Sequence, residues 1–181
     1  RIIVSDEIES VCPEFVGAHV EIYVHNSPYS AGLWGEIDRL GQEFRQTLTT
    51  ETLKDISGTK QTLVDLVNLA SIRYGYSIGG FDADKFEGDT LTLGVGRAGE
   101  PYEGIGRGTI NIEGLPVYRD AVGGVGTPTS DHERTKIDDN TTHLVVLING
   151  YDGCEADVRA NAEYILQLAS DYCDGTDGSY Y

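Results

Sequence analysis

Three stretches of the chain have the hydrophobic pattern of β-strands. Residues 18–25 alternate between apolar and polar side chains, and this period of two is typical of a strand with one buried face. A second alternation over residues 89–95 predicts another strand. Residues 143–149 form a continuous apolar run, which favours a strand covered on both faces. The sequence therefore predicts at least one sheet whose central strand is buried from both sides.

Three other stretches have helical periodicity. Apolar positions over residues 30–45 recur every three or four residues, which predicts a helix that covers a core with one face. Residues 62–74 are apolar on more than one side, so we expect a central helix whose polar exceptions, Asp65 and Asn68, need defined partners. A third helix is expected after residue 153 and up to Tyr172, followed by a loose tail at residues 174–181. Strands and helices do not alternate regularly, so we predict an α+β fold: one domain over residues 1–181, with a mixed sheet and covering helices.

The net charge of −17 excludes several classes of function. A field this negative disfavours DNA, broad binding to an RNA surface and anionic lipid. No apolar run is long enough to cross a bilayer, and the first residues lack the apolar core of a signal peptide, so we expect a cytoplasmic protein without membrane contact. The three cysteines are far apart and form no C-x-x-C pair, which indicates reduced structural thiols rather than a disulfide framework or a zinc site.

Several short motifs have plain structural explanations. The match Gly94-Val95-Gly96-Arg97-Ala98-Gly99 to G-x-G-x-x-G is not followed by a helical pattern, so we expect a strand–turn–strand rather than a dinucleotide site. The run Ser130-Asp131-His132 is contiguous, whereas catalytic triads assemble from distant segments, and a turn or helix cap is the simpler interpretation. The acidic residues after position 150 do not have calcium-loop spacing. We therefore expect neither a metal nor a cofactor.

Residues 115–136 are the strongest candidate for a site. The middle of the chain, residues 61–137, carries seven of the 13 cations, and 14 of the 23 glycines lie between Gly75 and Gly126. Within it, the segment 115–136 combines an Arg-Asp pair, four turn-forming residues and the cluster Ser-Asp-x-Glu-Arg-Thr. Two interpretations remain open: a ligand pocket, or a structural turn held by the ion pairs Arg119–Asp120 and Asp131–Arg134.

Two long motifs give the chain a family resemblance. The V-D-x-x-N pattern at residues 64–68, followed by Phe81-Asp82, resembles the core of the B3/B4 domain in the phenylalanyl-tRNA synthetase beta subunit. The segment from Arg119-Asp120 to Glu133-Arg134-Thr135 resembles free-standing bacterial members of the same domain family. The similarity covers about residues 62–150. In the synthetase this domain is an α+β unit whose pocket hydrolyses tyrosine wrongly esterified to the phenylalanine tRNA, without a metal, so the resemblance implies an α+β fold with such a pocket.

The pattern departs from that family at three pocket positions. Val67 stands where the synthetase has Thr, and Gly79 stands where it has His. The glycine-rich turn Gly126-Thr127-Pro128-Thr129 lacks the acidic residue that recognises the tyrosine hydroxyl in the family. The resemblance therefore implies the fold but does not carry tyrosyl specificity.

The resemblance and the local chemistry together give a first expectation of function. We expect a free-standing B3/B4-like domain that binds the aminoacylated 3′ end of tRNA, or a related small amino-acid ester, and that as an enzyme would be an aminoacyl-tRNA deacylase rather than a ligase. The alternative is a non-catalytic module that binds an amino acid-like molecule. The expected catalytic residues are Thr127, Thr129, Ser130 and Asp131, and the expected substrate-binding residues are Asn68, Gly79, Gly80, Arg119, Asp120 and Arg134.

Each of these residues has an expected role. Arg119 and Arg134 would face a phosphate or carboxylate, and Asp131 or Asp120 would hold the α-amino group. A hydroxyl of the turn, from Thr127, Thr129 or Ser130, would orient water.

Overall fold

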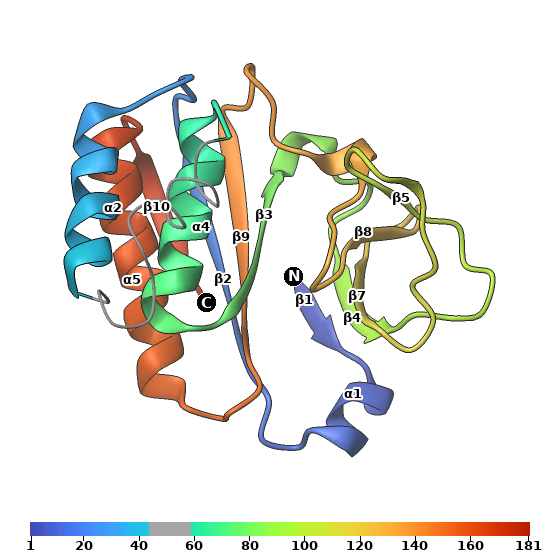
Figure 1. Cartoon of the computed structure of the whole chain (residues 1–181). Coiled ribbons are helices and arrows are strands. Elements are labelled where there is room, and N and C mark those ends of the chain that lie inside the picture. The colour runs from blue at the N-terminus through green and yellow to red at the C-terminus, as the bar shows by residue number, and fades with distance from the viewer. Residues whose placement is uncertain (44–58) are drawn as a thin grey trace.

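The computed structural model describes residues 1–43 and 59–181, and its first layer is a four-stranded antiparallel sheet. The strand order is β10 (Thr176–Tyr180), β2 (Val16–Tyr23), β9 (His143–Gly150) and β3 (Ser77–Asp82). Helices α2 (Ala31–Glu43), α4 (Thr62–Tyr74) and α5 (Glu155–Tyr172) cover one face of this sheet (Figure 1).

A smaller sheet lies on the other face. Its order is β1 (Ile2–Val4), β4 (Leu91–Val95), β7 (Pro116–Arg119) and β8 (Gly124–Gly126). Strands β1 and β4 are parallel and the other pairs are antiparallel, so this sheet is mixed. Helix α1 (Asp6–Val11), the two-residue strands β5 (Glu103–Gly104) and β6 (Gly108–Thr109), and the 3₁₀ turns Ala83–Lys85 and Glu133–Thr135 complete the described elements. The α+β prediction is confirmed.

Strand β9 separates two hydrophobic cores. Leu144, Val146 and Ile148 belong to the core beneath the helices. Val145 and Leu147 point the other way, into the core shared with the smaller sheet. This is why the run reads as continuously apolar: successive side chains of a strand point to opposite faces, and here both faces are buried.

The predicted helices and strands agree with the structure at most of their ends. Helix α4 spans the predicted residues and ends at Gly75, whose φ of 76° is in the left-handed region that glycine adopts without strain. Helix α2 matches the predicted covering helix up to Glu43, and residues 44 and 45 of that prediction lie outside the described residues. Within the described ranges, none of the helices has the length and apolar character that a membrane crossing requires.

The loose tail expected at residues 174–181 is wrong. Residues Thr176–Tyr180 form β10, an edge strand that pairs with β2. Gly175 and Gly178 make the pairing possible, because a Cβ at either would lie 2.7–3.0 Å from Ile22 Cδ1. This strand could not be predicted from the sequence because its residues are mostly polar and do not alternate with apolar ones. The strand is stabilised by pairing with β2 rather than by a buried face of its own.

Candidate functional site

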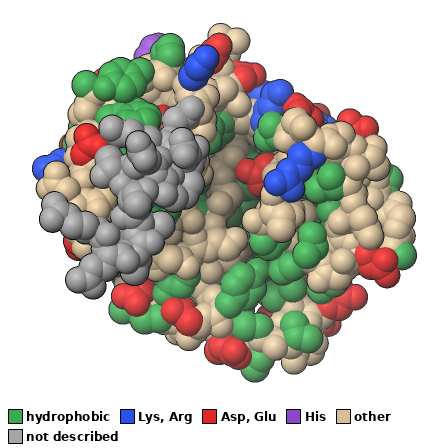
Figure 2. Space-filling view, in the orientation of Figure 1, with side chains coloured by type: hydrophobic (Ala, Val, Ile, Leu, Met, Phe, Trp, Pro, Cys, Tyr) green, Lys and Arg blue, Asp and Glu red, His purple; other side chains and the backbone are tan. Residues whose placement is uncertain are grey.

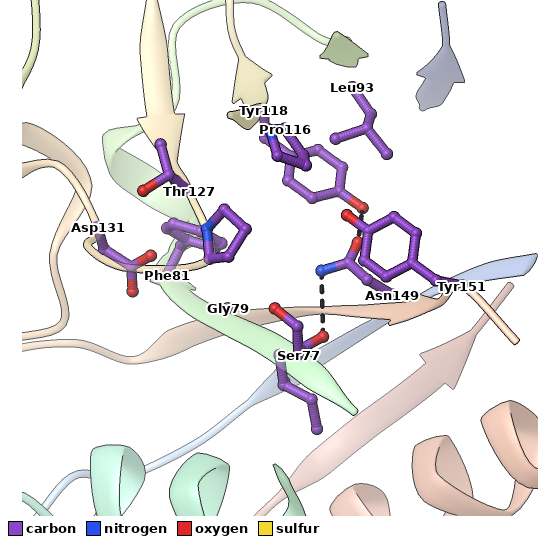
Figure 3. Close-up of a pocket in the computed structure, with 13 residues that line it drawn as sticks. Ser77, Gly79, Phe81, Leu93, Pro116, Tyr118, Thr127, Asp131, Asn149 and Tyr151 are labelled. Atoms are coloured by element: carbon purple, nitrogen blue, oxygen red, sulfur yellow. Dashed lines mark hydrogen bonds between the residues drawn. The ribbon is translucent and has the colours of Figure 1, made fainter. Parts of the chain in front are cut away.

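A narrow cavity of about 20 Å³, with room for about one water molecule, lies where the two sheets meet. Its walls come from β3 of the large sheet, from β7 and β8 of the small sheet, and from the loop that follows β8 (Figure 3). The lining residues are Ser77, Ile78, Gly79, Phe81, Leu93, Pro116, Tyr118, Gly126, Thr127, Pro128, Asp131, Asn149 and Tyr151. Three of the residues expected at a site, Gly79, Thr127 and Asp131, therefore line one cavity.

Asp131 is the most perturbed acid of the site. Burial raises the pKa of its carboxyl to about 7. Two glycines lie next to it: a Cβ on Gly126 would lie 3.2 Å from Asp131 Oδ1, and a Cβ on Gly79 would lie 3.8 Å from the same atom. Neither a hydrogen bond nor an ion pair holds this carboxyl to another described side chain. A largely buried carboxyl that no other described side chain pairs with is a candidate ligand-binding or catalytic group.

A wider groove of about 500 Å³ adjoins the cavity on the side of α4. Asn68 and Gly80 line this groove, together with Lys136 and Ile137, and Asp131 lines both spaces. Asp131 thus stands where the groove and the cavity meet. Of the ten residues expected at a site, five line one or both of these spaces: Asn68, Gly79, Gly80, Thr127 and Asp131.

The loop that carries Thr127 and Asp131 is fixed by its own hydrogen bonds. The Thr127 hydroxyl donates to the Ser130 carbonyl at 2.8 Å and accepts from the Ser130 N–H at 3.1 Å. The phenol of Tyr102, which is 1% exposed, donates to the same Ser130 carbonyl at 2.6 Å. Sequence reasoning missed Tyr102, because nothing in its neighbourhood distinguishes it from other tyrosines.

The other two hydroxyls of this loop do not line either space. Ser130 faces Gly104, where a Cβ would come within 2.6 Å of Ser130 Oγ. The Thr129 hydroxyl lies 3.5 Å from that of Thr127, on the exposed side of the turn. Of the three residues whose hydroxyls were expected to orient water, Thr127 is therefore the one that lines the cavity, and its hydroxyl is hydrogen-bonded within the loop.

The arginines form ion pairs with partners other than the expected ones. Arg119 binds Glu100 through two hydrogen bonds of 2.7 and 2.8 Å, not Asp120. Arg134 binds both oxygens of Asp120 at 2.8 and 2.9 Å, not Asp131. The expected pairs are wrong, because neighbours along a strand or turn point apart while residues on different segments converge.

Asp120 is already saturated with donors. Burial alone would raise the pKa of its carboxyl, but Arg134 and the N–H groups of Glu87, Val122 and Gly123 lower it to about 2. Its side chain is fully buried, and Arg119, Asp120 and Arg134 line neither the cavity nor the groove. These three residues hold the loops on either side of β8.

The acids of the V-D-x-x-N and Phe-Asp motifs also have structural partners. Asp65, buried in α4, accepts hydrogen bonds from the N–H and the hydroxyl of Thr59 at 3.1 and 3.0 Å. Asp82 accepts from the Thr141 hydroxyl at 2.9 Å and caps the 3₁₀ turn that follows β3. No cluster of three His, Cys, Asp or Glu side chains placed to hold a metal ion occurs in the described part of the chain.

Three polar residues at the far end of the cavity were not expected. The Tyr118 phenol donates to Asn149 Oδ1, and Asn149 Nδ2 donates to the Ser77 carbonyl at 3.1 Å. Figure 3 shows the Tyr118 and Tyr151 hydroxyls beside Asn149, with the Phe81 ring between them and Asp131. A signal was present: Asn149 is a polar residue within an apolar run, on the strand face shared by Val145 and Leu147.

The family comparison agrees with this architecture. The sequence profile described as the B3/4 domain matches residues 42–172 of the chain. The chain belongs to the B3/4 domain family. The family match confirms the resemblance inferred from the motifs. A search of curated proteins found no match to the sequence.

A solved structure resembles this B3/4 domain over nearly its whole length. It is the crystal structure of an N-terminal fragment of the phenylalanyl-tRNA synthetase beta-subunit from Pyrococcus horikoshii, with a TM-score of 0.62 and 12% sequence identity. The alignment covers 99% of this chain and 49% of the fragment, so the B3/4 domain spans about half the length of that protein. At this identity the likeness establishes a shared fold.

Proposed function

We propose that this B3/4 domain binds the aminoacylated 3′ end of tRNA, or a related small amino-acid ester, and hydrolyses the ester in trans. The observation that carries the proposal is Asp131: a largely buried carboxyl without a side-chain partner in the described chain, at the junction of the cavity and the groove. An amino acid inserted beside it would bring an α-ammonium group, which is the partner that a buried carboxylate lacks.

The proposed chemistry depends on positioning. The Asp131 carboxylate holds the α-ammonium group, which fixes where the ester carbonyl lies. The Thr127 hydroxyl donates its hydrogen bond to the Ser130 carbonyl, so towards water it acts as an acceptor. An aminoacyl ester is labile, and orienting it against a held water molecule is sufficient for catalysis. The absence of side chains at Gly79 and Gly80 admits the Phe81 ring and the Val67 side chain beside β3, and these two side chains form part of the walls of the cavity and the groove.

The surface charge restricts how much of a tRNA can bind. In the view of Figure 2, Lys and Arg side chains are interspersed with Asp and Glu rather than gathered into one basic patch. With a net charge of −17, contact along the body of a tRNA would be repulsive. The proposal is therefore limited to the 3′ end, and it predicts weak affinity that falls as salt is added.

The direct test is deacylation by the purified protein. Tyrosyl-, alanyl- and seryl-tRNA are each incubated with the protein, with Asp131→Asn and with Asp171→Asn, a control that neutralises an exposed aspartate at the end of α5. We expect hydrolysis of at least one ester by the native protein and by the control, and loss of it in Asp131→Asn. No rate above buffer for any of the three would end the enzymatic proposal.

A second candidate is a non-catalytic module that binds an amino acid-like molecule in the same cavity. It is favoured by Thr129 and Ser130, whose hydroxyls do not line the cavity, and by the absence of a titratable side chain at Gly79. Calorimetry against free amino acids, aminoacyl adenylate analogues and bulk tRNA separates the two functions. Heat with a small molecule and none with tRNA would favour the binding module.

A further inference from the structure

The imidazole of His143 lies between two carboxylates from different parts of the chain. His143 is the first residue of β9, and its Nε2 lies 2.7 Å from Glu21 Oε1 on β2. Its Nδ1 lies 3.2 Å from Asp84 Oδ1, on the 3₁₀ turn Ala83–Lys85 that follows β3. The Tyr23 ring is stacked on the imidazole with the ring centroids 4.5 Å apart, which holds the imidazole plane in place. The imidazole therefore connects this turn to the large sheet.

Only one protonation state of the imidazole satisfies both contacts. An ionised carboxylate accepts hydrogen bonds and cannot donate them, so each ring nitrogen needs a hydrogen of its own. The neutral imidazole has one N–H, and its other nitrogen is an acceptor. In the neutral state one of the two contacts therefore brings two acceptors together, which is repulsive. Histidine is the side chain that ordinarily changes between these two states from about pH 5 to 8.

The contact with Asp84 is the one that the neutral imidazole loses. It is the longer of the two, and the Asp84 side chain is 68% exposed against 44% for Glu21, so water replaces its hydrogen bond more easily. Glu21 is held within β2, which pairs with β9, whereas Asp84 lies on a turn outside the sheet. We expect neutral His143 to keep its hydrogen on Nε2, towards Glu21, and to present the lone pair of Nδ1 to Asp84.

The other charged groups near His143 do not replace these contacts. The shallow pocket beside it also contains Arg1, His19 and Asp89, and the N-terminal ammonium group donates to the Asp89 carbonyl. Arg1 opposes a positive charge on His143, and Asp89 favours it. Within residues 1–43 and 59–181, the ring nitrogens of His143 have no further charged side chain at hydrogen-bond distance.

The turn also supports one wall of the groove. Lys85, the residue after Asp84, donates through Nζ to the Lys136 carbonyl at 2.6 Å and to Asp138 Oδ2 at 2.7 Å. Its Nζ also lies 3.7 Å from Oδ2 of Asp82, at the end of β3. Lys136 and Asp138 line the groove. A movement of the turn is therefore transmitted to the groove wall through Lys85.

We propose that His143 is a pH-dependent tie between the large sheet and the turn Ala83–Lys85. Protonated His143 binds Glu21 and Asp84 together. When the Nδ1 proton is lost the turn is released, and the contacts of Lys85 with the groove wall loosen. This tie acts in the free protein, whatever the groove binds.

NMR of the full ¹⁵N-labelled chain between about pH 5 and 8 tests the tie. The ring ¹⁵N signals of His143 show which nitrogen carries the hydrogen, and we expect the Nε2–H tautomer at pH 8. The backbone amide signals of Asp84, Lys85, Lys136 and Asp138 should shift with the same midpoint as the ring. The equilibrium between the held and the released turn should change by up to about fivefold, which is typical of one exposed ion pair.

The variant Asp84→Asn separates the tie from ordinary titration. The Asn amide can accept a hydrogen bond from the protonated ring and donate one to the neutral ring, so the turn stays held in both states. His143 still titrates in this variant, but the signals of Lys136 and Asp138 should no longer follow it. The control is His25→Gln, which removes an exposed histidine just after β2 and should leave the native pattern unchanged.

An Nδ1–H tautomer at pH 8, or a ring that keeps both hydrogens there, would overturn the proposal. Groove-wall signals that ignore the His143 titration in the native protein, or that keep following it in Asp84→Asn, would do the same. All these results are obtained without a ligand, so failure of the tie and failure of ester hydrolysis are separate outcomes.

Discussion

The buried carboxyl of Asp131 has a measurable effect on stability. Burial raises its pKa in the folded state from an ordinary 3.8 to about 7. Below pH 3.8 the group is protonated in both the folded and the unfolded chain, and it contributes nothing. As the pH rises above 3.8 the unfolded chain releases this proton while the folded chain retains it, so the folded state loses stability until the pH passes about 7.

The size of the effect follows from the same two values. A tenfold change in proton affinity corresponds to about 1.4 kcal/mol, so the full penalty at pH 8 is at most about 4 kcal/mol. Asp131→Asn removes the charge and keeps the shape. We therefore expect this variant to be more stable than the native protein at pH 8, by up to about 4 kcal/mol, and to show a much smaller gain at pH 5. Stabilisation on removal of a polar group is typical of functional sites.

Urea unfolding of both proteins at pH 5, 6, 7 and 8 measures the difference. The control is Asp171→Asn, which removes a carboxylate exposed to water and should show no comparable growth in stability between pH 5 and 8. A difference between Asp131→Asn and the native protein that stays constant over this range, or that decreases with pH, would refute the assignment of Asp131 as a buried, unpartnered acid.

Three other predictions concern the scaffold around the site. Arg119→Ala leaves the largely buried carboxylate of Glu100 without its ion-pair partner, so the free energy of unfolding measured in urea should fall by about 3 kcal/mol. The affinity for a ligand that binds at Asp131 should not change. A loss of ligand affinity with unchanged stability would contradict the structural role. Gly126→Ala places a Cβ 2.5 Å from the Phe81 ring and 3.2 Å from Asp131 Oδ1, so ligand binding by calorimetry should weaken at least about tenfold, and unchanged affinity would place the ligand elsewhere. Removal of residues 176–181 uncovers Ile22 and the edge of β2 and should cost about 2 kcal/mol in urea unfolding, whereas a tail without structure would cost nothing.

The site was only partly accessible from the sequence. Asp131 and Thr127 stand out because a polar, glycine-rich segment is unsuited to a core, and both line the cavity. Arg119 and Arg134 looked equally suitable as ligand-binding groups. In the structure, however, Arg119 forms an ion pair with Glu100, and Arg134 forms one with Asp120. Their partners lie 19 and 14 residues away in the chain, and sequence spacing does not say which distant segments meet.

The sequence by itself determined the elements that carry their own hydrophobic period. Helix α4 and strand β9 could be predicted from the local pattern, because the spacing of their apolar residues shows which faces are buried. Strand β10 could not, because an edge strand of polar residues is stabilised by its neighbour rather than by its own pattern. Tertiary structure alone brought Tyr118, Asn149 and Tyr151 to one end of the cavity and Asp131 to the other, since a site is formed by contacts between segments that the chain order keeps apart.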